Sequence, residues 1–138
     1  MIDNSLKIVN KMLSKDHFSK WLGLTILELK PGYCKLSVRV NKLMLNGFSI
    51  GHGGVCFSIS DSALAFSANA KGKVSYTLEA KSSYLEKVYE GDLLTAESKE
   101  ISSNNSKGVF RVEVKNQKNQ SVFTLDGAVY ITDKKWMI

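Results

Sequence analysis

Residues 55–70 have the sequence VCFSISDSALAFSANA, which is apolar or small at almost every position. A helix on a protein surface carries an apolar stripe and a polar face, whereas this segment has no polar face. It therefore predicts a helix that other elements enclose on all sides. One residue between Phe48 and Ala70 carries a full charge, and that residue is Asp61.

Asp61 needs an explanation, because a carboxylate is rarely buried without a partner. In a structural interpretation, Asp61 is the N-cap of a second helix that follows a break at Ser60, or it lies on the one solvent-exposed face of the helix. A functional interpretation makes it a base or a nucleophile in a largely apolar site. We favour the functional interpretation, because a helix so uniformly apolar has no other use for a charge.

The flanking sequence predicts the elements that surround this helix. Residues 3–21 have helical periodicity with a break near Ser14, and Gly23 ends the segment. A hairpin around Pro31-Gly32 and four consecutive strands, expected to pair as a meander, account for most of the rest. The expected fold is α+β, a long central helix wrapped by an antiparallel β-sheet, with an extra N-terminal helix. The expected strands are residues 24–29, 34–40, 74–84, 92–102, 108–116 and 121–133.

Length and composition indicate one globular domain over residues 1–138, since 43% of the residues are hydrophobic and 23% are charged. The net charge of +6 suits an anionic partner, but the basic residues are scattered, which argues against nucleic acid. The chain lacks a secretory start and an apolar run of membrane-spanning length. We therefore expect a cytoplasmic protein with reduced thiols at Cys34 and Cys56 and no membrane partner.

The tripeptide His52-Gly53-Gly54 stands directly before the apolar helix. Glycines at a helix N-terminus let a substrate approach the free N–H groups, so the motif suits a carbonyl or oxyanion site. The alternative is a loop that merely needs glycine conformations. Gly53 and Asp61 are eight residues apart, which is about 12 Å along a helix axis. If both act on one carbonyl, they must come from two antiparallel helices of a two-fold dimer.

Two other motifs carry less weight. Residues 47–51, GFSIG, match the nucleophile elbow of hydrolases, but a triad histidine downstream and a parallel sheet are both missing. His52 and Cys56 could form a dyad, although a small buried thiol is the commoner case. With only two histidines in the chain, we expect no metal site.

Asn46, His52-Gly53-Gly54 and Asp61 together form the pattern N-x5-HGG-x6-D-x-A. This set resembles the hotdog-fold thioesterases, and most closely the phenylacetate-degradation (PaaI-like) acyl-CoA thioesterases. The resemblance implies that Asp61 is the nucleophile or general base and that the Gly53 N–H polarises the thioester carbonyl. It also implies that Asn46 and His52 orient the substrate and the loop, and that Thr77 lies near the attacking water.

Substrate contacts also follow from the resemblance, with one departure. Gly54 falls among the substrate-binding N–H groups. The family often has an Arg-Pro pair where this chain has Glu86-Lys87. The usual nucleotide contact is therefore altered, and Lys87 is left to bind a phosphate.

The function implied is hydrolysis of an acyl-CoA or aryl-acyl-CoA thioester to free acid and CoA, without metal or cofactor. The resemblance further implies a homodimer or dimer of dimers with sites at the subunit interface. Three alternatives stay open: a non-catalytic acyl-CoA or lipid-binding hotdog protein, a nucleic-acid binder and a dehydratase. Asp61 argues against the first, since a binding protein does not need this carboxylate.

Overall fold

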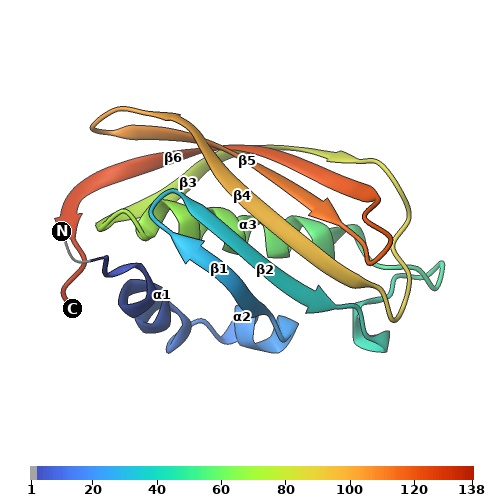
Figure 1. The fold of residues 1–138 in the computed structure, drawn as a ribbon. Helices are drawn as coiled ribbons and strands as arrows, with labels where there is room; N and C mark the ends of the chain where they lie inside the picture. Colours follow the sequence, from blue (N-terminus) through green and yellow to red (C-terminus); the bar gives the residue numbers. More distant parts are fainter. Residues whose placement is uncertain (1–2) are drawn as a thin grey trace.

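The computed structural model describes residues 3–138 as three α-helices, a short 3-10 helix and one six-stranded sheet (Figure 1). The expected N-terminal helix is two helices, separated at the predicted break near Ser14. Within these residues, no helix is both long and apolar enough to cross a membrane. The elements are α1 (Ser5–Leu13), α2 (His17–Leu22), β1 (Thr25–Lys30), β2 (Tyr33–Arg39), η1 (Lys42–Met44), α3 (Gly53–Asn69), β3 (Lys73–Tyr84), β4 (Leu93–Ser103), β5 (Lys107–Lys115) and β6 (Ser121–Lys135).

The strand order is β1-β2-β4-β5-β6-β3, and every neighbouring pair is antiparallel. The expected meander is correct for β4, β5 and β6 but wrong for β3. Both sides of β4 are occupied, by β2 and β5, so β3 pairs with β6 instead and forms an edge of the sheet. Residues 85–92 carry the chain from this edge back to the middle of the sheet.

Helix α3 packs against one face of the sheet, which curves over it in Figure 1. Ile59, Ala63 and Leu64 are fully buried, as are the inward-pointing residues of the strands. The alternation predicted for β2 is confirmed, since Cys34, Leu36 and Val38 are buried while the intervening residues are less so. The inward set includes Leu94, Ala96, Phe110, Val112, Val114, Phe123 and Leu125.

The expectation that α3 is enclosed on all sides is only partly correct. Phe57 has 37% of its surface exposed, and Asp61 and Ala65 on the same side are half-buried. Helices α1 and α2 contact α3 but do not cover this side completely. A single chain therefore leaves one strip of its most apolar helix open.

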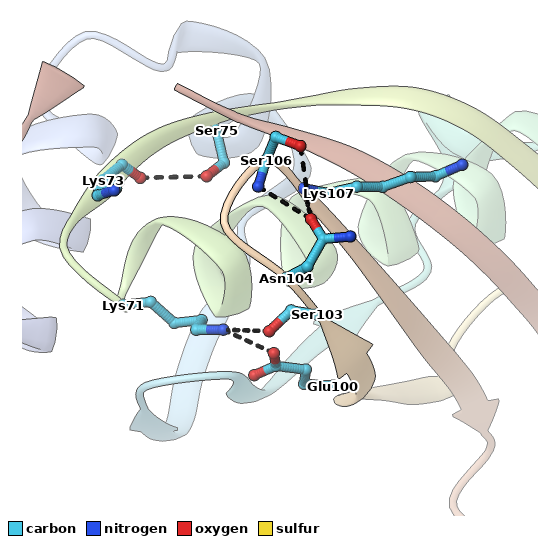
Figure 2. A network of polar contacts seen from close by, with 8 residues as sticks. All are labelled: Lys71, Lys73, Ser75, Glu100, Ser103, Asn104, Ser106 and Lys107. Atoms are coloured by element: carbon cyan, nitrogen blue, oxygen red, sulfur yellow. Dashed lines mark hydrogen bonds and ion pairs between the residues drawn. The ribbon is translucent and has the colours of Figure 1, made fainter. Parts of the chain in front are cut away.

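The C-terminal end of α3 is tied to the β4–β5 hairpin by a polar network (Figure 2). Lys71, just beyond the helix, forms an ion pair of 2.6 Å with Glu100 and donates a hydrogen bond of 2.9 Å to Ser103. Within the hairpin turn, Asn104 Oδ1 accepts hydrogen bonds from the backbone N–H groups of Ser106 and Lys107. The ion pair and the hydrogen bond made by Lys71 connect this end of the helix to β4.

Gly127 in β6 marks the closest approach of the sheet to α3, because a Cβ atom at this position would collide with the buried Leu64 side chain. We expect Gly127→Ala to lower the free energy of unfolding by about 1–3 kcal/mol, the usual cost of overpacking a core. Chemical denaturation at fixed protein concentration measures the effect. Gly47→Ala is the matched control, since a Cβ atom there has no neighbour within 4 Å. Equal stabilities of the two variants would contradict this account of the packing.

Candidate active site

The N-terminus of α3 presents a free backbone donor. His52 is the N-cap residue, and its Nδ1 accepts a hydrogen bond of 2.8 Å from the Gly54 N–H. Within residues 3–138, the Gly53 N–H donates to no acceptor. Gly53 rather than Gly54 is therefore the donor available to a ligand, at the positive end of the helix dipole.

A cleft of about 720 Å³ opens in front of this helix end. The N-terminal end of α3 is its right-hand end in Figure 1. It brings together Asn46, His52, Gly53 and Lys87, four of the residues singled out in the sequence. Its remaining walls come from residues 84–89 and from the β5–β6 turn, which contributes Asn116, Gln117, Lys118 and Gln120. Gly54 is not among the lining residues.

Asn46 shapes the loop on one wall of the cleft. Its Oδ1 accepts hydrogen bonds from the backbone N–H groups of Phe48 at 2.9 Å and Ile50 at 3.4 Å. Its own N–H donates to the carbonyl of Ile50 at 2.8 Å. The side-chain oxygen is thus occupied with holding the loop that leads to His52.

Tyr84, at the end of β3, is a cleft residue that the sequence analysis missed. Its hydroxyl donates a hydrogen bond of 3.0 Å to the Gly53 carbonyl, and its ring packs edge-on against Phe123 with centroids 5.0 Å apart. Lys118 was missed as well. Each lies far along the chain from Gly53, and no local pattern indicates that the fold brings them to the helix end.

Asp61 lies in a separate groove of about 280 Å³. The carboxylate is half-buried, and its Oδ1 accepts a hydrogen bond of 3.1 Å from the Thr77 hydroxyl of β3. The structure therefore joins Asp61 and Thr77 directly. The groove has a second carboxylate, Asp16, which is occupied by the N–H and hydroxyl of Ser19 at 2.9 and 2.6 Å.

The cleft at Gly53 and the groove at Asp61 share no lining residue within one chain. The seven residues between them are all helical, so the rise of α3 over eight positions separates them by about 12 Å. One chain thus carries a free backbone donor at Gly53 and a carboxylate at Asp61 in two different hollows.

The alternative dyad of His52 and Cys56 is not formed. Cys56 lines the cleft but is only 5% exposed, and burial raises the pKa of its thiol to about 12. A thiol with this pKa is not a nucleophile at neutral pH. The Nδ1 of His52 accepts a hydrogen bond from the Gly54 N–H and is not available to the thiol. Cys56 packs in the hydrophobic core.

Comparison with known proteins identifies the family of this chain. Residues 48–123 match the family model described as "Thioesterase superfamily", which is more than half of the chain. A protein of Archaeoglobus fulgidus that is described as an esterase on provisional grounds is 36% identical over 90% of this chain and 80% of its own length. The acyl-coenzyme A thioesterase PaaI of Escherichia coli is 30% identical over 84% of this chain and 83% of its own.

The solved structure of E. coli PaaI superimposes with a TM-score of 0.93 and covers 96% of each chain, at 26% identity. The chain belongs to the thioesterase superfamily and has the hotdog fold. Its class of activity is the hydrolysis of thioesters.

The contact between Tyr84 and Gly53 yields a prediction for catalysis. We expect Tyr84→Phe to lower kcat/KM for thioester hydrolysis about two- to tenfold, since a net hydrogen bond contributes about 0.5–1.5 kcal/mol to holding Gly53 in place. Tyr89→Phe is the control, because Tyr89 lines the same cleft and its hydroxyl has no hydrogen-bond partner within residues 3–138. If both variants match the parent, the Tyr84 hydroxyl has no part in shaping the site.

Proposed function

We propose that this protein hydrolyses acyl-CoA thioesters to the free acid and CoA in sites shared between two subunits. The observation that carries the proposal is the pairing of two unusual groups on one helix. Asp61 is a half-buried carboxylate with a hydroxyl partner, and Gly53 is a helix N-terminal residue with an unoccupied N–H. Thioester hydrolysis needs one group of each kind. The name of the E. coli relative supports CoA as the thiol.

A second subunit supplies the missing half of each site. β3 is a twelve-residue edge strand, and its side chains Tyr76 and Leu78 are each 60% exposed. A long exposed edge of this kind favours pairing with another chain. Two-fold pairing of β3 with its own copy would place the two α3 helices side by side and antiparallel.

The position of Phe57 is consistent with this arrangement. In two antiparallel helices related by a two-fold axis, Gly53 of one lies level with Asp61 of the other when the axis passes at the residue midway between them. That residue is Phe57, a large apolar side chain that is 37% exposed in the single chain. The dimer would bury it, together with the open strip of α3.

In the assembled site, the Gly53 N–H of one subunit donates to the thioester carbonyl oxygen and stabilises the negative charge that develops on it. Asp61 of the partner subunit either removes a proton from the attacking water or attacks the carbonyl carbon itself. The Thr77 hydroxyl, bonded to Asp61, orients this carboxylate. The C–S bond then breaks, and CoA leaves as the thiolate and takes up a proton. If Asp61 acts as the base, the attacking water has already supplied the oxygen of the free acid. If Asp61 acts as the nucleophile, water next hydrolyses the acyl-aspartyl anhydride, which releases the free acid and restores the carboxylate.

The cleft at Gly53 accommodates the CoA moiety. Lys87 and Lys118 stand on two of its walls and supply positive charge for the phosphates of the nucleotide. Asn116, Gln117 and Gln120 add side-chain amides for polar contacts. The net charge of +6 favours the approach of this anionic substrate.

The role of Asp61 is tested by its amide variant. We expect Asp61→Asn to stay folded and to lower kcat by about a hundredfold or more on a panel of acyl-CoA substrates, as loss of a base or nucleophile does. A thiol-detecting assay measures the released CoA. Asp133→Asn, the same change at an exposed carboxylate of β6, should match the parent. An Asp61→Asn enzyme with the parent rate on every substrate would overturn the catalytic role of Asp61.

The shared site is tested by mixing two inactive variants. Gly53→Pro removes the N–H, and the helix tolerates proline because Gly53 is the first helical residue and His52 is extended, with ψ 139°. Mixed with Asp61→Asn and allowed to exchange subunits, it should restore activity towards about a quarter of the parent value. About half of the dimers are then mixed, and each of these contains one site with neither defect.

Gly53→Ala is the control for this experiment, because it keeps the N–H and brings the same Cβ atom to within 3.2 Å of the Tyr84 ring. It should retain activity that Gly53→Pro loses. Native mass spectrometry verifies that mixed dimers form. Mixed dimers without recovery of activity would show that each subunit carries a complete site of its own.

A further inference from the structure

The short helix α2 carries two exposed aromatic side chains that the fold of the single chain does not require. Phe18 is 55% exposed and Trp21 is 52% exposed. Their rings stack on each other, with centroids 6.1 Å apart and an interplanar angle of 27°. Stacking in offset geometry stabilises the orientation of both rings, so the pair presents a preformed apolar wall.

Helix α2 is fastened to α3 beside Asp61. Asp16 caps α2 by accepting from the backbone N–H of Ser19, and Gly23 ends the helix in the left-handed conformation at φ 69°. The buried Ser19 hydroxyl lies 2.9 Å from the hydroxyl of Ser62, the residue next to Asp61. The position of Phe18 relative to Asp61 is therefore set by direct contacts.

Phe18 and Asp61 line the same groove. Its other apolar walls include Met12, Phe57 and Ala65, and the hydroxyl residues Ser58 and Ser62 line it as well. The other carboxylate in it, Asp16, is occupied by Ser19, so Asp61 is the one acidic group of the groove available to a substrate. The groove, of about 280 Å³, thus places the Asp61 carboxylate beside apolar side chains that include Phe18.

We infer that this groove binds the acyl group of the substrate and that Phe18 determines which acyl groups are accepted. This inference rests on the proposed function. A carbonyl carbon positioned at Asp61 would direct its acyl substituent along the groove towards Phe18. Trp21 does not line the groove but is a positioning residue, which holds the Phe18 ring by stacking. The preferred substrates carry an apolar acyl group long enough to reach Phe18, whereas acetyl ends before it.

The test is a comparison of acyl groups rather than of overall rates. We expect Phe18→Ala to lower kcat/KM for hexanoyl-CoA and benzoyl-CoA at least tenfold, mainly by raising KM. The same variant should change kcat/KM for acetyl-CoA less than twofold. Losing apolar contacts in a binding pocket commonly gives effects of this size. Leu6→Ala is the control, because Leu6 is an apolar side chain of α1 that is 60% exposed and lies outside the groove. Leu6→Ala should leave kcat/KM unchanged for all three substrates.

Trp21 is tested by rescue. Trp21→Phe keeps a ring against Phe18 and should preserve the preference for hexanoyl over acetyl, whereas Trp21→Ala should weaken it. If Trp21 had a purely structural role, Trp21→Ala would lower kcat/KM for all substrates by the same factor. Phe18→Ala could instead lower kcat/KM for acetyl-CoA and hexanoyl-CoA by the same factor and dissociate the dimer. In that case the aromatic pair is a subunit contact and the inference is overturned.

Calorimetry separates this inference from the proposed function. The parent should bind hexanoyl-CoA more tightly than CoA, and Phe18→Ala should lose this difference while still binding CoA. A parent that hydrolyses no acyl-CoA overturns the proposed function, yet loss of the affinity difference in Phe18→Ala would still support the groove as the acyl site. An active parent whose acyl preference is unchanged in Phe18→Ala overturns the acyl assignment alone. An inactive parent that binds hexanoyl-CoA no better than CoA overturns both.

Discussion

The structure depends on covering a helix that is apolar on every side with a sheet that can cover only part of it. The curved sheet buries Ile59, Ala63 and Leu64, and the close approach at Gly127 brings the helix against β6. The opposite side of α3 has only the two short N-terminal helices beside it. An open strip with Phe57 and Asp61 is the consequence.

That strip lies between the two groups that we propose to act on the substrate. The sheet holds α3 so that its N-terminus faces the cleft, while Asp61 turns towards β3 and Thr77. Helix geometry keeps these two groups apart, because no bend of a regular helix brings residues eight positions apart onto one small carbonyl. The exposed edge of β3 runs beside the same strip. In the dimer that we propose, one contact between two chains would both cover the edge and bring Gly53 and Asp61 together.

The two N-terminal helices have a different relation to the site. The core does not need Phe18 or Trp21, since both remain half-exposed. Their placement instead follows from the contact between Ser19 and Ser62, which joins α2 to α3 next to the carboxylate. The groups that we propose to be catalytic thus belong to the sheet and its central helix, whereas Phe18 on the groove wall belongs to a short helix near the N-terminus. Such a division allows the wall to change without disturbing the chemistry.

The sequence by itself determined the elements, the apolar central helix and the lone carboxylate on it, because periodicity, turn residues and an isolated charge are local signals. It also determined how far apart Gly53 and Asp61 lie, since the rise of a regular helix is fixed. Only the tertiary structure decided that β3 lies at the edge beside β6, since several strand orders satisfy the same alternation. It alone placed Tyr84 and Lys118 in the cleft, joined Thr77 to Asp61 and left the Gly53 N–H free. These contacts join residues distant in the chain, and strand pairing brings them together without leaving a pattern in the local sequence.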